Sequence, residues 1–274
     1  MSGVSRRTLP GFSLGLGYTV AYLSLLVLIP LAACFVKAAG LGPEEFAAAA
    51  WTPRARAAYA LTFGAALTAA AVNVVLGLVV AWTLVRYDFP FRRLVDALVD
   101  VPLALPTAVA GLVYASLYVQ NGWLGQFLVP LGVEAAYTRL GIVLVLVFTG
   151  FPFVVRTVQP VLADLDAEVE EAAAVLGASR LQVFRRVILP TLIPPALTGF
   201  ALAFARGLGE YGSVIFISSN VPFRTEIAPV LVVARLEEFA YREAAAVAVV
   251  LLVFSFAMLA VVNLLERWSK RHGG

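Results

Sequence analysis

Long apolar runs separated by short charged segments constrain this sequence more than any other feature. About 20 helical residues cross a hydrocarbon core about 30 Å thick, and six stretches of the chain are long enough to do so. They lie at about 14–36, 59–85, 94–119, 140–159, 192–217 and 243–265. Because 61% of the 274 residues are hydrophobic and only 14% are charged, an ordinary soluble domain is excluded. The sequence predicts an all-α, polytopic membrane protein with six transmembrane helices.

Two of these runs contain residues that are unusual in a membrane helix. Pro102 and Pro106 lie near the start of the third run. They predict a bent helix that packs against protein rather than lipid. Asn73 lies at mid-depth in the second run, where we expect an interhelical hydrogen bond rather than a substrate contact.

The residues that enzymes use for covalent chemistry are scarce. The only lysines are Lys37 and Lys270, and neither belongs to a G-x-x-x-x-G-K-[ST] phosphate loop. A single histidine, His272, and a single cysteine, Cys34, exclude a Ser-His-Asp triad, a Cys-His pair and a His/Cys zinc site. We therefore expect no enzyme activity, catalytic residue, metal or cofactor on this chain, the alternative being an aspartate-based intramembrane enzyme that uses Asp100. The net charge of +3 comes without a dense basic run, so no nucleic-acid partner is expected.

The distribution of Lys and Arg predicts an orientation. Eleven lie in segments on the side of the termini: Arg6, Arg7, Arg86, Arg92, Arg93, Arg180, Arg185, Arg186, Arg267, Lys270 and Arg271. Seven lie in the opposite segments 37–58, 120–139 and 218–242, which we expect to be external loops: Lys37, Arg54, Arg56, Arg139, Arg224, Arg235 and Arg242. Because positive charge is enriched in cytoplasmic segments, both termini and the segment between the fourth and fifth runs are predicted to be cytoplasmic.

That cytoplasmic segment, 164–195, is a polar and helix-forming interruption of the apolar pattern. Ala, Glu, Val and Leu, with acids in the first turns, predict a helix over 166–176 that ends at Gly177 in a left-handed conformation. Ser179 is expected to cap a second short helix over 180–188. Pro190, Pro194 and Pro195 are expected to end this second helix and to begin the next span.

The two short helices are amphipathic and cannot bury their apolar faces alone. One interpretation is that they dock on a partner protein. The other is that Phe184 and Val187 lie on the membrane interface while Arg185 and Arg186 meet anionic lipid. The residues by themselves favour neither interpretation.

A spaced motif in this segment resembles a known family. The motif consists of Glu171-Ala172-Ala173, then Gly177 after three residues, Val187 after nine more, and Leu189-Pro190 after one more. It resembles the E-A-A loop of permease subunits of bacterial ATP-binding-cassette importers, in which isoleucine is usual at the position of Val187. The resemblance extends from about Tyr59 to the end of the chain. It implies the type I importer permease fold, in which this loop is a coupling helix that sits in a cleft of a separate ATPase subunit.

Carried onto this chain, the resemblance implies an organisation and a set of coupling residues. Residues 1–58 form an N-terminal span and external linker, 59–265 the core permease domain with coupling helices at 164–190, and 266–274 a cytoplasmic tail. The implied ATPase-coupling residues are Glu171, Ala172, Ala173, Gly177, Ala178, Ser179, Phe184, Val187, Leu189 and Pro190.

A second set of residues narrows the resemblance. This set resembles the corresponding residues of the T (or U) subunits of sulfate/thiosulfate importers. It consists of Gly209-Glu210-Tyr211-Gly212, 215–220, Pro222, 225–229 and 235–238. Molybdate/tungstate importer permeases share the Gly-Glu-aromatic-Gly element and are the alternative, and a stand-alone secondary anion transporter is a further one.

The sulfate importer resemblance also implies partners and a location. The partners are a W-type permease as heterodimer, two ATPase subunits that bind ATP and Mg, a periplasmic sulfate-binding protein and membrane lipid. The implied location is the bacterial inner membrane, and the implied role is half of the translocation path.

Two pairs of charged residues within the predicted spans need an interpretation. Arg206 and Glu210 are four apart, hence on one helix face. We interpret them as a self-neutralising structural pair, with a positive potential from Arg206 for a passing dianion as the alternative. Asp96 and Asp100 are expected to contact the coupling loop or neighbouring arginines rather than the substrate.

Overall fold

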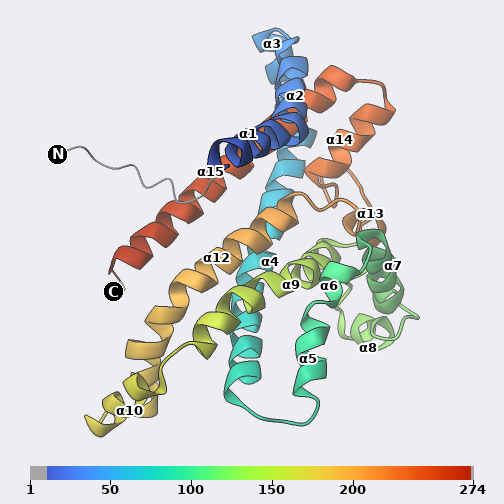
Figure 1. The fold of residues 1–274 in the computed structure, drawn as a ribbon. Coiled ribbons are helices and arrows are strands. Elements are labelled where there is room, and N and C mark those ends of the chain that lie inside the picture. Colours follow the sequence, from blue (N-terminus) through green and yellow to red (C-terminus); the bar gives the residue numbers. More distant parts are fainter. Residues whose placement is uncertain (1–10, 273–274) are drawn as a thin grey trace, which may run out of the picture.

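The computed structural model describes residues 11–272, and the side chains of residues 11–264. Arg6 and Arg7, and the side chains of Arg267, Lys270 and Arg271, on which part of the orientation argument rests, lie outside this description. Within the described residues all regular structure is helical (Figure 1), as the composition predicts. Five helical segments are long and apolar enough to cross a membrane: Phe12–Ala39, Pro53–Arg86, Arg139–Ala163, Arg180–Leu208 and Tyr241–Leu264.

Three long helices cross at the centre of the molecule. They are α4 (Pro53–Arg86), α9 (Arg139–Ala163) and α12 (Leu189–Leu208). Small residues allow this close approach, because a Cβ added at Gly77 would lie 2.6 Å from Val154 Cγ1, and one at Gly199 would lie 2.5 Å from Thr157 Oγ1.

Asn73 lies in this crossing, beside Gly150, and its side chain is fully buried. Its amide finds no hydrogen-bond partner within the described residues. The predicted interhelical hydrogen bond is therefore not formed, and the neighbouring Gly150 has no side chain that could supply a partner.

The N-terminal span is the most loosely attached part of the fold. It consists of α1 (Phe12–Leu23), a π-helical turn over Ser24–Leu28 and α2 (Ile29–Ala39). The only buried residue in these three elements is Ala38. Helix α2 and the short α3 (Pro43–Ala50) pack against α15 (Tyr241–His272), as Figure 1 shows.

The third predicted span is broken into three helices: α5 (Arg92–Val99), α6 (Val101–Ala104) and α7 (Thr107–Tyr118). Leu105 adopts an extended conformation with ψ 134° because the ring of Pro106 disfavours a helical residue before it. The prediction of a bent helix is thus confirmed, and the bend is a full interruption.

Two predicted segments differ from the structure. The fifth span stops at Leu208, and a turn then leads to α13 (Val214–Ile217), which packs against α7. The segment 218–242 is more than a polar external loop, because it contains α14 (Ala228–Glu237) with Ala228 and Leu231 buried. Pro229 at the first turn of α14 suits a helix start.

The segment 120–139 holds α8 (Gly125–Leu128) and a 3-10 turn over Val129–Leu131.

Candidate functional site

The first of the two short helices that precede the fifth span forms as the sequence predicts. Helix α10 (Ala167–Val175) begins after Asp166, whose carboxylate accepts a hydrogen bond from the Glu168 N–H at 3.0 Å. It ends at Gly177, which has φ +82°. The N–H groups of Ala178 and Gly177 donate to the carbonyls of Ala173 at 3.1 Å and Ala174 at 2.9 Å, the bonding pattern of a Schellman motif.

The second helix begins as predicted but does not end as predicted. Ser179 and Gln182 form a capping box, with the Ser179 N–H donating to Gln182 Oε1 at 2.7 Å. Helix α11 (Arg180–Val183) and a π-helical turn over Phe184–Ile188 then continue into α12 without a break.

The prediction that prolines 190, 194 and 195 end this helix is wrong. The Leu189 N–H bonds to the carbonyl of Phe184, five residues back. This wide turn stands directly before Pro190, where a regular turn would crowd the proline ring. Pro194 and Pro195 then lie inside α12. The second short helix and the fifth span therefore form one continuous helical segment from Arg180 to Leu208.

The junction of the two helices exposes a small apolar surface. Val175 and Leu176 are each 88% exposed and Leu181 is 58% exposed; we call these three residues the tip surface. Helix α10 contains no buried residue at all. It projects from one end of the molecule (Figure 1). Exposed apolar side chains beside charged ones are typical of a docking surface.

The predicted coupling residues divide between the tip and its base. Glu171, Ala172, Gly177 and Ser179 are exposed, whereas Ala173, Ala178, Val187, Leu189 and Pro190 are partly buried. Phe184 points toward α4, and its ring meets that of Trp82 edge-on, with ring centroids 5.7 Å apart.

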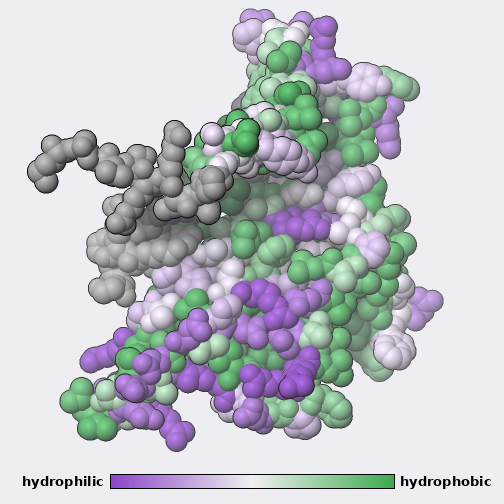
Figure 2. Space-filling model, viewed as in Figure 1, coloured by the Kyte–Doolittle hydropathy of each residue, from purple (hydrophilic) through white to green (hydrophobic). Residues whose placement is uncertain are grey.

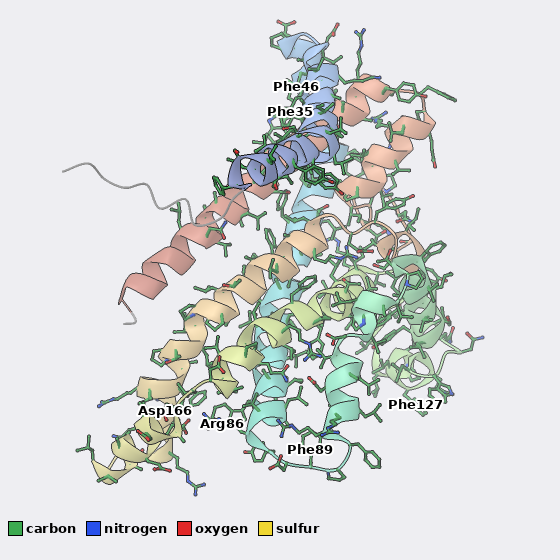
Figure 3. All side chains as sticks on the ribbon, viewed as in Figure 1. Phe35, Phe46, Arg86, Phe89, Phe127 and Asp166 are labelled. Atoms are coloured by element: carbon green, nitrogen blue, oxygen red, sulfur yellow. The ribbon has the colours of Figure 1, made fainter. Side chains whose placement is uncertain are left out.

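An ion pair that the motif does not include also holds α10. Arg86, at the end of α4, pairs with Glu170 and lies over the ring of Trp82 at 5.3 Å. Figure 3 labels Arg86 and Asp166 at this end of the molecule. Sequence reasoning missed this pair because its partners are 84 residues apart and no local pattern links them.

The structure brings Arg206 and Glu210 together. Arg206 Nη1 lies 2.5 Å from Glu210 Oε2. The other carboxylate oxygen of Glu210 accepts from the N–H of Ser213 at 2.9 Å and from its hydroxyl at 2.8 Å. The Glu210 side chain is 1% exposed and that of Arg206 33%. The pair therefore ties the end of α12 to the start of α13.

Asp96 and Asp100 contact an arginine, as predicted, and that arginine is Arg156 on α9. Arg156 Nε and Nη2 donate to the two oxygens of Asp100 at 2.9 and 2.6 Å. Nη1 donates to Asp96 Oδ1 at 2.6 Å and to Gln159 Oε1 at 2.7 Å, and Nη2 donates to the Asp96 carbonyl at 2.8 Å. All five N–H donors of the guanidinium are thus used. We call Arg156, Asp96, Asp100 and Gln159 the Arg156 cluster.

A further buried acid lies at the opposite end of the molecule. Arg54 donates to both oxygens of Glu226, at 2.8 and 2.6 Å, and the Glu226 side chain is 2% exposed. The sequence offered no signal for this pair.

Figure 2 shows hydrophilic residues gathered on the visible face over the lower half of the molecule, around α5, α9 and α10. Among the side chains that the structure describes, no group of three or more His, Cys, Asp or Glu could hold a metal ion.

Comparisons with known proteins agree with this architecture. The family model described as "Binding-protein-dependent transport system inner membrane component" matches residues 73–271. A Synechocystis protein named "Sulfate transport system permease protein CysT" is 53% identical over 93% of this chain and 89% of that protein. Its Escherichia coli namesake is 46% identical over 97% of both chains.

Solved structures agree on the fold. A bacterial ABC transporter involved in the import of the acidic polysaccharide alginate superposes with a TM-score of 0.76 at 17% identity. The match covers 93% of this chain and 94% of that one. An amino acid ABC transporter superposes with a TM-score of 0.53 over 79% of this chain.

Proposed function

Because this chain belongs to the inner-membrane components of binding-protein-dependent transport systems, we propose that it is the permease subunit of an ATP-driven sulfate importer. The observation that carries this proposal is its identity of 46 to 53%, over nearly the whole chain, to proteins named sulfate transport permeases. It is a multi-pass membrane protein. We further propose that it lies in a bacterial inner membrane with both termini in the cytoplasm, and that thiosulfate is a second substrate.

The energy for transport comes, in this proposal, from a separate ATPase. ATP and Mg bind to that partner, and the tip surface with Glu171 and Gly177 docks in a cleft of it. Three features support docking: the exposed apolar side chains of the tip surface, the rigid Schellman turn, and the continuous helix that leads from Arg180 into the membrane. A displacement of the tip is then transmitted directly to α12.

The complete importer would contain four further chains. They are a W-type permease that supplies the other half of the translocation path, two ATPase subunits, and a periplasmic sulfate-binding protein. The exposed apolar faces of α1 and α5 leave ample surface for a second permease and for lipid. Arg206 and Glu210, in this proposal, are a structural pair, since Glu210 is buried and engaged on both oxygens.

The deciding experiment is uptake of labelled sulfate in a bacterial strain that lacks its own sulfate permeases. We expect uptake when this chain is expressed with its ATPase, second permease and binding protein, and competition by unlabelled thiosulfate. Preferential uptake of molybdate would instead establish the molybdate/tungstate alternative. Sulfate uptake by the chain without the ATPase would contradict the proposal in favour of a secondary transporter.

A further inference from the structure

Helix α5 is weakly attached to the rest of the molecule. Together with the short α6, it lies between two interruptions, one at Phe91, which has φ +64°, and one at Leu105 before Pro106. Its only buried residue is Val99, and Leu94 and Leu98 are more than half exposed. The Arg156 cluster is therefore the main polar attachment of α5 to α9.

The Arg156 cluster is fully bonded and yet partly exposed at the surface of the chain. Asp96 and Asp100 have side chains that are 40% and 48% exposed, although each is bound by the same guanidinium. When such a cluster separates, water replaces the lost hydrogen bonds and no charge is left buried and unpaired. This distinguishes it from the pair at Glu210, which cannot open without leaving a buried carboxylate that lacks an opposite charge.

The cluster also lies between two helices that both connect to α10. Helix α9 runs from Arg156 for two turns to Ala163 and continues along the chain into α10. Helix α4 ends at Arg86, which pairs with Glu170 of α10, and the chain then leads directly into α5. A displacement of α10 therefore reaches α5 from one side and Arg156 from the other.

We propose that the Arg156 cluster is a polar latch that closes α5 onto α9 in this state and opens in every transport cycle. This inference rests on the proposed function, because a cycle presupposes ATP-driven movement of α10. Closed, the two carboxylates and one guanidinium sum to a net charge of −1, which repels a dianion. Opening separates the carboxylates from Arg156 and leaves its positive charge free for the anion that passes. In the closed state Arg156 is a positioning residue for α5, through its pairs with Asp96 and Asp100.

The test is to tether the closed latch in the complete importer, reconstituted in lipid vesicles with its ATPase, second permease and binding protein. The Asp96 Oδ1 and Gln159 Nε2 atoms lie 3.2 Å apart. Both residues are replaced by cysteine in a Cys34→Ala background, and a short bis-methanethiosulfonate reagent then joins the two cysteines. The pair between Arg156 and Asp100 stays intact. We expect the tether to lower ATP-driven sulfate uptake about tenfold, relative to the same variant before tethering, and a reductant to restore it.

A matched control tethers the opposite end of the molecule. The hydroxyl oxygens of Ser219 and Thr225 lie 2.7 Å apart, and the Ser219→Cys, Thr225→Cys variant treated with the same reagent should keep its uptake. Unchanged uptake with the Asp96–Gln159 tether in place, verified by mass spectrometry, would overturn the latch.

A second measurement covers the case in which the cysteine variant is inactive before tethering. Asp100→Asn keeps the side-chain size but removes the charge, so we expect more ATP hydrolysed per sulfate imported, by about fivefold. Asp88→Asn, which alters the exposed pair with Arg92, should leave this ratio unchanged. Equal ratios for Asp100→Asn and wild type would overturn the latch, whereas absence of sulfate uptake by the wild-type importer would contradict the proposed function itself.

Discussion

Buried ion-paired acids occur at one end of this molecule and not at the other, among the described side chains. Toward the end that carries α3 and α14, Glu226 and Glu210 are almost completely buried, although Glu238 and Glu243, which pair with Arg235 there, are about half exposed. Toward the end that carries α10, the acids that pair with Arg156 and Arg86 are between a quarter and a half exposed. The geometry of the individual bonds is similar at both ends, so burial alone sets them apart.

This difference has a physical meaning. Removing one partner of a buried pair leaves an unpaired charge and costs about 3 to 5 kcal/mol, whereas a solvent-exposed pair contributes about 0 to 1 kcal/mol. The buried pairs therefore join elements permanently: Arg54 joins α4 to the segment before α14, and Arg206 joins α12 to α13. The partly exposed pairs of Arg156 with Asp96 and Asp100 open at a lower cost, near the end where the ATPase is proposed to act.

The largest effect is expected at Glu226. Arg54→Met should lower the free energy of unfolding by about 3 kcal/mol, because it leaves a carboxylate buried and unpaired. Thermal unfolding in detergent measures this. The control is Arg235→Met, whose partners Glu238 and Glu243 are about half exposed and which should change little. Equal effects of the two variants would break the comparison between buried and exposed acids.

The next effect is expected at Arg206. Arg206→Ala should lower the free energy of unfolding by about 2 kcal/mol. This is less than for Arg54→Met, because Glu210 keeps its hydrogen bonds to Ser213. We expect the amount of assembled importer to fall more than sulfate uptake per assembled complex, which quantitative blotting together with uptake would show. The reverse ratio would place Arg206 in the translocation path.

A smaller effect is expected at the helix junction. Gly177→Leu should destabilise the junction by about 1 kcal/mol, because no L side chain favours φ +82°, although no atom lies within 4 Å of the added Cβ. The protein should stay in the membrane but lose its ATPase, as co-purification would show, and Glu171→Lys should act likewise. Gly64→Ala is the control, since Gly64 also has open space but an ordinary helical conformation. Full ATP-dependent uptake by Gly177→Leu would contradict the coupling assignment.

The smallest effect on stability is expected at Glu170. Glu170→Gln removes the ion pair with Arg86 but should change the free energy of unfolding by less than about 1 kcal/mol, as thermal unfolding would show. An effect as large as that of Arg54→Met would mean that the α10 end is as rigidly joined as the other end.

Local features of this fold were predictable from the sequence. The left-handed Gly177 and the capping residue Ser179 each follow from residue types within one or two helical turns. The pairing of Arg206 with Glu210 follows from a spacing of four on one helix. The interruption at Pro106 follows from the proline itself, and its ring explains why the third span is not one helix.

Contacts between distant segments were not predictable. Arg156 lies 56 residues from Asp100, and Arg54 lies 172 residues from Glu226, so no periodicity relates them. The continuation of the helix through Pro190 depends on a π-helical turn, which has no reliable sequence signal. Asn73 was expected to bond across helices, but the residues that face it are known only once the helices are placed.

The glycines at the central crossing have a mechanical consequence. With backbone so near to side chain at Gly77, Gly150 and Gly199, α4, α9 and α12 are interlocked and cannot slide along one another without collision. Rotation about the crossing is the movement that this packing leaves open. In the proposed importer, a displacement at α10 would therefore turn the opposite ends of these helices the other way. The close crossing of the three helices thus depends on the absence of a side chain at each of these three glycines.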